Sequence, residues 1–255
     1  MKLSDFHIVY INLDKRPEKR QFIELQLRQL GLLEQAHRFP GIDGQTLDPS
    51  IQDYYLKRFK TMAKKRDRIL GRIGCFLSHK AVLELAINTG LDNILILEDD
   101  CKFLIDKDIE LPDPPSDAEI IYFSGLFWKQ NPEPNSLHLK NLHRDWIPID
   151  RTYLKIAGAI AYAIIGLDNI KKVYQKIIQP RPSAIDILYI NYVQKKTQTK
   201  DKRLFLPGHC YIINPVIAVP NLDFPSDVTF IGQSKAPLYK NIYFYDKQQQ
   251  KLLSQ

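Results

Sequence analysis

Three consecutive carboxylates, Glu98, Asp99 and Asp100, stand directly after a continuous aliphatic run at residues 93–97. Such a run is typical of a buried strand, so the carboxylates are expected at its carboxyl end. Adjacent carboxylates resist burial unless a positive charge neutralises them. The three carboxylates are predicted to bind Mn²⁺ or Mg²⁺, which could hold a diphosphate. Strand alternation favours Glu98 and Asp100 as the two that touch the ion, because alternate residues face the same side. A solvated strand end with capping or salt-bridge roles is the alternative.

The elements that position this cluster are predicted to alternate between strands and helices. An apolar strand at residues 7–13 leads into a helix that Asp14 caps, Pro17 begins and Gly31 ends. The residues predicted on the buried face of that helix are Ile23, Leu27 and Leu30.

The rest of the chain continues this alternation. A helix is predicted to follow residues 71–74 and to end at Gly90, and Asp168 is expected to cap another helix. Residues 126–150 are predicted to form a long polar loop, and a helix is expected from Ser183 to about Gln194. Further strands are predicted at residues 38–39, 119–123, 157–165 and within 204–219. The fold class is therefore α/β, with a mostly parallel sheet, helices on both faces and ligands at the carboxyl ends of strands.

Length and composition favour one globular domain. The chain has 255 residues, of which 44% are hydrophobic and 25% charged, so a substantial core is expected and disorder is not. No apolar run reaches the roughly 18 residues of a membrane-spanning helix. The cysteines Cys75, Cys101 and Cys210 have no disulfide or zinc-site spacing. We expect a cytoplasmic protein in which Cys75 is a packing residue.

Basic residues concentrate in two segments, and the net charge is +7. Seven of the residues 57–68 are Lys or Arg, and the second block lies at 195–203. Each block is first interpreted as a solvated face, and docking to an anionic membrane is the next interpretation. No nucleic-acid partner is expected, since neither zinc spacing nor an aromatic consensus strand accompanies the blocks.

Six ordered segments resemble glycosyltransferase family 25, the group of bacterial lipooligosaccharide galactosyltransferases and related collagen glucosyl- and galactosyltransferases. Each segment is weak alone, but the ordered set is specific and covers roughly residues 7 to 190. The matching segments are residues 9–16 with Arg20, 41–44, 71–79, 96–100, 161–164 and 185–186.

The resemblance implies a GT-A-like nucleotide-diphospho-sugar transferase fold, a UDP-sugar donor and an acidic metal motif that includes the catalytic Asp100. It also implies inversion at the anomeric carbon by direct displacement. Inversion requires a general base that removes the proton of the acceptor hydroxyl, and Asp186 is the candidate. A helix cap is the alternative role for Asp186.

The same resemblance indicates donor contacts. Asn12, Arg16 and Arg20 follow the first strand, where an arginine could bind phosphate through its planar fork. Asp43, between two glycines, could accept hydrogen bonds from ribose hydroxyls or the uracil ring. For Asn12, Arg16 and Arg20 the alternative is a charged first helical turn without donor contacts. For Asp43 the alternative is a plain turn.

Ser78 and His79 are predicted to lie in the first turns of a helix, where backbone N–H groups and the helix dipole favour an anion. By the resemblance they would line the donor pocket. A structural role is the alternative for a lone histidine.

The leading hypothesis is a galactosyltransferase acting on a lipooligosaccharide or lipopolysaccharide glycan, with peripheral contact to the anionic inner membrane. A single domain 1–255 is expected, with a nucleotide part at about 1–125, an acceptor part at about 126–235 and a tail at 236–255. The alternatives are a transferase using UDP-glucose or another UDP-sugar, a metal-dependent phosphohydrolase and a binding module without activity.

Overall fold

The computed structural model of the chain describes residues 1–61, 63–124, 126–128, 144–149, 155–178, 182–186, 188–189, 209–214, 216–221 and 223–224. All structural statements concern these residues. In this part of the chain, the helices are too short or too polar to cross a membrane.

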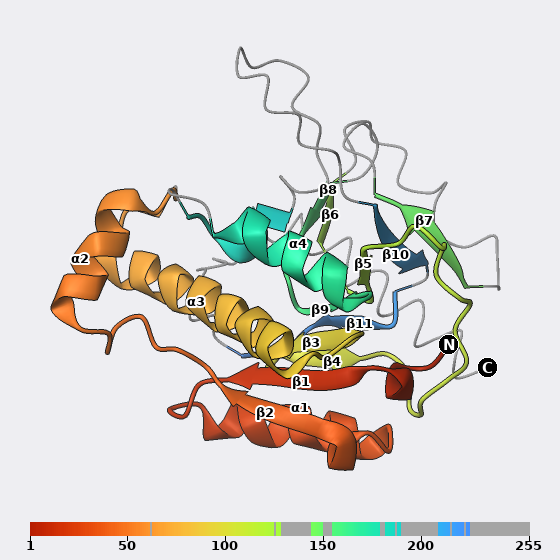
Figure 1. Ribbon diagram of the computed structural model, residues 1–255. Coiled ribbons are helices and arrows are strands. Elements are labelled where there is room, and N and C mark those ends of the chain that lie inside the picture. The colour runs from red at the N-terminus through yellow and green to blue at the C-terminus, as the bar shows by residue number, and fades with distance from the viewer. Residues whose placement is uncertain are drawn as a thin grey trace, which may run out of the picture.

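A seven-stranded sheet forms the centre of the protein (Figure 1), with strand order β2-β1-β3-β9-β5-β10-β7. Its strands in chain order are β1 His7–Asn12, β2 Ala36–Pro40, β3 Ile94–Glu98, β5 Ile120–Tyr122, β7 Asp145–Pro148, β9 Ala161–Ile164 and β10 Cys210–Asn214. Five strands run in one direction, while β9 and β7 run against them. Two further antiparallel pairs join β4 Cys101–Phe103 to β11 Ala218–Pro220 and β6 Leu126–Trp128 to β8 Lys155–Ala157.

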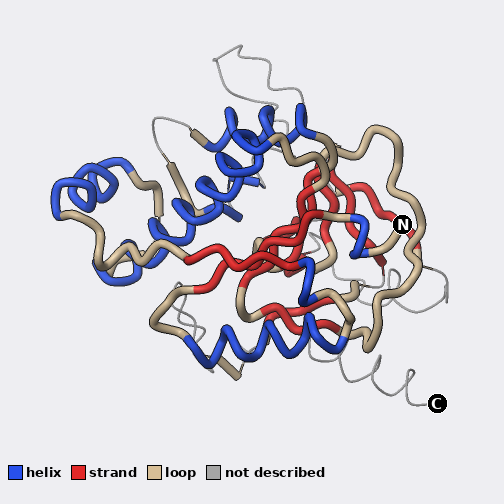
Figure 2. The backbone as a smooth tube through the Cα atoms, turned by 60° about the horizontal axis from the view of Figure 1, so that its bottom comes forward, coloured by secondary structure: helices blue, strands red, loops and turns tan. Residues whose placement is uncertain are grey.

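Helices cover both faces of the sheet (Figure 2). The face that receives Ile94 and Ile96 of β3 packs against α3 Arg66–Thr89 and α4 Leu167–Ile177. The face that receives Leu95 and Leu97 packs against α1 Pro17–Gln29. The remaining helices are η1 Leu3–Asp5, η2 Leu33–Gln35 and α2 Pro49–Arg58. The predicted α/β class, with a mostly parallel sheet between helices, is confirmed.

The start of α3 differs from the prediction. The helix begins at Arg66, so residues 71–74 lie inside it rather than before it. Gly74 of this segment and Gly44 allow close packing: a Cβ on Gly74 would lie 2.4 Å from the Ile42 carbonyl oxygen, and one on Gly44 would lie 1.9 Å from the Leu70 carbonyl oxygen. Glycine is therefore required where the turn at residues 41–44 packs on the helix.

Several other predicted boundaries need correction. Asp14 does not cap α1, because Arg16 occupies the cap position and Asp14 pairs with Arg38 instead. Gly166, not Asp168, precedes α4. The loop predicted at 126–150 contains β6 and β7 at its ends.

Other boundary predictions hold within the described residues. Gly90 ends α3 with φ 68°, as predicted, and Gly31 follows α1 with φ 73°. Residues 185–186 and 188–189 are helical, whereas Ser183, the predicted start, pairs with Lys60 in an isolated bridge. The rest of the helix predicted to Gln194, the basic block at 195–203 and the tail at 236–255 lie outside the described residues.

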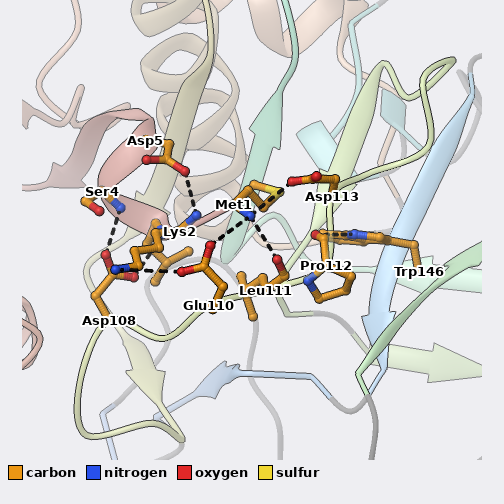
Figure 3. Close-up of polar contacts among 11 residues, drawn as sticks. Met1, Lys2, Ser4, Asp5, Asp108, Glu110, Leu111, Pro112, Asp113 and Trp146 are labelled. Atoms are coloured by element: carbon orange, nitrogen blue, oxygen red, sulfur yellow. Dashed lines mark hydrogen bonds and ion pairs between the residues drawn. The ribbon is translucent and has the colours of Figure 1, made fainter.

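Contacts at the amino terminus position the start of β1 (Figure 3). The two carboxylate oxygens of Asp108 accept hydrogen bonds from the backbone N–H groups of Leu3 and Ser4, at 3.0 and 3.1 Å. The amino group of Met1 donates to the Leu111 carbonyl at 2.9 Å. The segment after β4 is thus tied to the segment before β1, which satisfies backbone groups at the start of η1.

Candidate metal and donor site

The acidic cluster lies where the connections of the sheet diverge. The chain passes from β1 through α1 to β2 on one side of β1, and returns through α2 and α3 to β3 on its other side. In open α/β sheets, ligands bind outside the carboxyl ends of strands at such a switch point. β1 ends there at Asn12 and β3 ends at Glu98. The fold therefore presents the cluster where a ligand is expected.

The three carboxylates do not share one strand. β3 ends at Glu98, and Asp99 and Asp100 lie in the turn that leads to β4. Glu98 faces α3, where His79 contacts it. The premise that strand alternation aligns Asp100 with Glu98 is wrong, because the strand ends before Asp100.

A buried lysine neutralises part of the cluster. Lys19 is 4% exposed, and its Nζ lies 3.4 Å from Asp99 Oδ1 and 3.8 Å from Asp100 Oδ2. Asn12, also buried, donates from Nδ2 to Asp99 Oδ2 at 2.9 Å. Asp99 is therefore held by one ion pair and one hydrogen bond from the first strand and helix.

Asp100 is the least satisfied of the three. Its Oδ1 is buried and accepts no hydrogen bond from the described residues. Burial, and then the charge of Glu98, raises the pKa of Asp100 to about 7. Lys19 offsets this only in part. A hard divalent cation fits these residues, because it would supply both the missing partner and the missing positive charge.

A buried hydrogen-bond chain leads away from Glu98. His79, 1% exposed, places Nε2 3.2 Å from Glu98 Oε1 and Nδ1 2.8 Å from the Tyr162 hydroxyl. The Tyr162 hydroxyl in turn lies 2.8 Å from that of Tyr189. Ser78 and His79 sit in the middle of α3. The prediction that they lie in the first turns of a helix is therefore wrong.

Cys75 lies on the Glu98 side of the cluster, and the charge of Asp186 acts on its thiol. The Cys75 sulfur is 3.9 Å from Glu98 Oε1. Burial, then the charges of Glu98 and Asp186, raises the pKa of the Cys75 thiol. Asp186, partly buried, is thus within electrostatic reach of the Glu98 side of the site, and it belongs to the same helical stretch as Tyr189.

The other predicted donor residues have partners of their own. Arg20 pairs with Glu24 at 2.7 Å, and Asp43 pairs with Lys15. The guanidinium of Arg16 lies 3.5 Å from Glu18, while its backbone carbonyl accepts from Asn12 Nδ2 at 3.0 Å.

Ser78 links the turn at residues 41–44 to α3. Its hydroxyl accepts from the Ile42 N–H and donates to the Gly74 carbonyl, both at 2.8 Å. The cluster thus brings together Asn12, Glu98, Asp99, Asp100 and His79 by direct contact, whereas Arg20, Asp43 and Ser78 contact other residues.

Sequence reasoning missed Lys19, Tyr162 and Tyr189. A signal existed for Lys19, because it precedes Ile23 by four residues and so belongs to the stripe that was predicted to be buried. A buried lysine implies a carboxylate partner. Tyr162 lies in the segment 161–164 that resembles the family, but neither that segment nor residue spacing indicated its contact with His79 or that of Tyr189 with Tyr162.

An open α/β sheet with carboxylates at its switch point has the arrangement of a ligand-binding α/β protein. The sequence model of glycosyltransferase family 25, described as an LPS biosynthesis protein, matches residues 6–189. The chain belongs to glycosyltransferase family 25, as the resemblance predicted.

Individual relatives match shorter segments. A glycosyltransferase 25 family member of Drosophila pseudoobscura pseudoobscura is 38% identical over 106 residues, covering 40% of this chain and 17% of the relative. One of Drosophila melanogaster is 31% identical over 159 residues, covering 55% and 24%. The mouse protein named inactive glycosyltransferase 25 family member 3 is 27% identical over 106 residues, covering 40% and 18%. The chain spans less than a quarter of the length of these curated relatives.

Among solved structures, a glycosyltransferase involved in the glycosylation of the major capsid of PBCV-1 is similar, with a TM-score of 0.42 and 11% identity. The match covers 93% of this chain and 98% of that one.

Proposed function

We propose that the chain is a metal-dependent glycosyltransferase that moves a sugar from a UDP-sugar to a hydroxyl of a glycan acceptor. The observation that carries the proposal is the buried, unpartnered Oδ1 of Asp100 within a three-carboxylate cluster at the switch point of the sheet. Membership of family 25 supports the reaction class. Some family members are named inactive, so the activity of this chain is tested on the cluster itself.

Glu98, Asp99 and Asp100 would hold Mn²⁺ or Mg²⁺. The bound dication would offset the charge that develops on the departing UDP. Lys19 and Asn12 hold the Asp99 carboxylate in one orientation, so the cluster does not rearrange freely when its charge changes. The cation would stabilise Asp100 most, because the buried Oδ1 of Asp100 accepts no hydrogen bond from the described residues.

Asp186 is the proposed general base. It would take the proton from the acceptor hydroxyl while that oxygen attacks the anomeric carbon, and the bond to UDP would break on the opposite face with inversion. Its support is its electrostatic proximity to Cys75, the neighbour of Glu98. Asn12 is the proposed donor contact nearest the carboxylates, with Arg16 beside it. Arg20, Asp43, Ser78 and His79 complete the proposed donor site.

The proposed donor sugar is galactose, and the proposed acceptor is a lipooligosaccharide or lipopolysaccharide glycan at the cytoplasmic face of an anionic membrane. A surface formed by the end of α2 and the start of α3 supports an anionic partner (Figure 1). The exposed basic residues of this surface are Lys57, Arg58, Lys60, Lys64, Lys65 and Arg66. Basic residues at the positive end of α3 are unfavourable by themselves, and an anion there would relieve that repulsion.

A donor screen tests the proposal. The chain would be incubated with a lipooligosaccharide acceptor and UDP-galactose, UDP-glucose or the N-acetylated UDP-sugars, with and without Mn²⁺, and UDP release measured. We expect acceptor-dependent release with Mn²⁺ and its loss in Asp100→Asn, with Asp106→Asn as the exposed carboxylate control.

The alternative, a phosphohydrolase, would use the same carboxylates to activate water. It predicts Mn²⁺-dependent phosphate release from simple esters without any acceptor. That outcome would contradict the proposed transferase activity. UDP release that does not depend on the acceptor would contradict it as well.

A further inference from the structure

A sulfur and an imidazole nitrogen converge on Glu98 from α3. Cys75 and His79 are four residues apart, so they lie one helical turn apart on the same face of the helix. The Cys75 sulfur is 3.9 Å and the His79 Nε2 is 3.2 Å from Glu98 Oε1. The ligand atoms of all three residues lie within 4.8 Å of one another.

The surroundings of His79 are those of a metal-ligating histidine. Such residues have the second ring nitrogen held by a hydrogen-bond partner, which fixes the ring. Here Nδ1 contacts the Tyr162 hydroxyl, which is itself held by Tyr189. In the tautomer that donates from Nδ1, the Nε2 lone pair points at the Glu98 carboxylate, an arrangement that a cation between the two would stabilise.

We propose that Cys75, His79 and Glu98 form a second cation site, with a preference for a soft dication such as Zn²⁺. Thiolate and imidazole ligands favour Zn²⁺ over Mg²⁺ and Mn²⁺, which favour carboxylates. Zn²⁺ binds sulfur at about 2.3 Å and nitrogen at about 2.0–2.1 Å in a tetrahedral arrangement. Tetrahedral ligands at these distances lie roughly 3.4–3.8 Å apart, so only small side-chain movements are needed.

The two sites share Glu98. When Zn²⁺ binds, the Cys75 thiol releases its proton to solvent and the sulfur bonds the ion as a thiolate. The Glu98 carboxylate is then committed to Zn²⁺ and withdrawn from Asp99 and Asp100. The cluster loses one of its three carboxylates, so Zn²⁺ is expected to weaken Mn²⁺ binding. This last consequence depends on the proposed function, whereas Zn²⁺ binding itself does not.

Cobalt spectroscopy tests the site on the full chain. Co²⁺ is titrated into the protein and the thiolate-to-cobalt charge-transfer band in the near ultraviolet is recorded. We expect a band that saturates at one Co²⁺ per chain, is abolished in Cys75→Ala and is removed by added Zn²⁺ but not by Mg²⁺. The buried cysteines give matched controls, because Cys101→Ala and Cys210→Ala should retain the band. The thermal unfolding of each variant, followed by circular dichroism, identifies any that fails to fold.

The absence of a thiolate band in the folded wild-type protein would overturn the proposal, as would an unchanged band in Cys75→Ala. Mn²⁺ binding, followed by electron paramagnetic resonance, separates this proposal from the proposed function. One equivalent of Zn²⁺ per chain should reduce Mn²⁺ affinity at least tenfold in the wild type and by clearly less in Cys75→Ala, where only direct competition at the carboxylates remains. A cobalt band in a protein that binds no Mn²⁺ would refute the proposed function and leave the second site standing.

Discussion

The Lys19 ammonium lies 3.4 Å from an Asp99 carboxylate oxygen, in a position where the lysine is 4% exposed. A lysine is buried in this way only when carboxylates compensate it. The pair joins α1 to the turn that follows β3, so Asp99, Asp100 and α1 form one electrostatic unit.

Replacing this lysine tests that unit. Lys19→Met leaves the carboxylates without their buried partner and is expected to lower the free energy of unfolding by about 3 kcal/mol at pH 8. Mn²⁺ should restore part of the loss, because it replaces the missing positive charge. Chemical denaturation with and without Mn²⁺ measures both effects.

Lys15→Met is the matched control, because Lys15 pairs with Asp43 but its side chain is 45% exposed. It should cost under about 1 kcal/mol. Equal losses in the two variants would contradict the special role of the buried lysine.

Protonation of Asp100 gives a second test in the metal-free protein. Its pKa is raised to about 7 in the folded state, above the ordinary value of 3.8, so the folded protein holds a proton that the unfolded chain has lost. The stabilising contribution is complete below about pH 3.8 and is lost as the pH rises through about 7. The stability of the wild type relative to Asp100→Asn should therefore fall across this range, by at most about 1.4 kcal/mol per pH unit.

Saturating Mn²⁺ should reverse this trend, because the cation binds the ionised carboxylate. Denaturation midpoints of both proteins between pH 4 and 8 provide the measurement. A difference that stays constant with pH would show that Asp100 does not titrate in this window.

The contact between the turn at residues 41–44 and α3 gives a third test. Gly74→Ala would place a Cβ 2.4 Å from the Ile42 carbonyl oxygen, and backbone on both sides must then shift. Although alanine favours helices, we expect a net loss of about 2 kcal/mol from the overlap.

Thermal unfolding followed by circular dichroism measures this loss. Leu85→Ala, on the exposed side of the same helix, is the control and should change stability little. A stabilised Gly74→Ala protein would mean that the turn does not pack on the helix as described.

The core strands could be predicted from local pattern. The apolar runs that form β1 and β3 end in charged residues, and both strands are buried on both faces because helices cover both sides of the sheet. The acidic cluster at the end of β3 was predictable for the same reason. The start of α3 was not, since Gly71 and Gly74 weaken helical propensity and the packing role of Gly74 depends on a turn some thirty residues earlier.

The site was predictable only in part, because its contacts cross long stretches of sequence. His79 meets Tyr162 and Glu98 through the packing of α3 on the sheet, and no spacing rule connects these positions. Arg20 was a reasonable phosphate ligand by position, yet the nearby Glu24 binds it in this structure. The burial of Lys19, by contrast, could have been predicted, because helical periodicity places it on the same face of α1 as Ile23 and Leu27.

The most direct test of the metal-dependent donor site is isothermal titration calorimetry of UDP into the chain, with and without Mn²⁺, for the wild type and Asp100→Asn. The account predicts that Mn²⁺ tightens UDP binding in the wild type by at least tenfold, and that Asp100→Asn loses this enhancement while remaining folded. UDP binding that is indifferent to Mn²⁺ in the wild type, or an enhancement retained in Asp100→Asn, would contradict it.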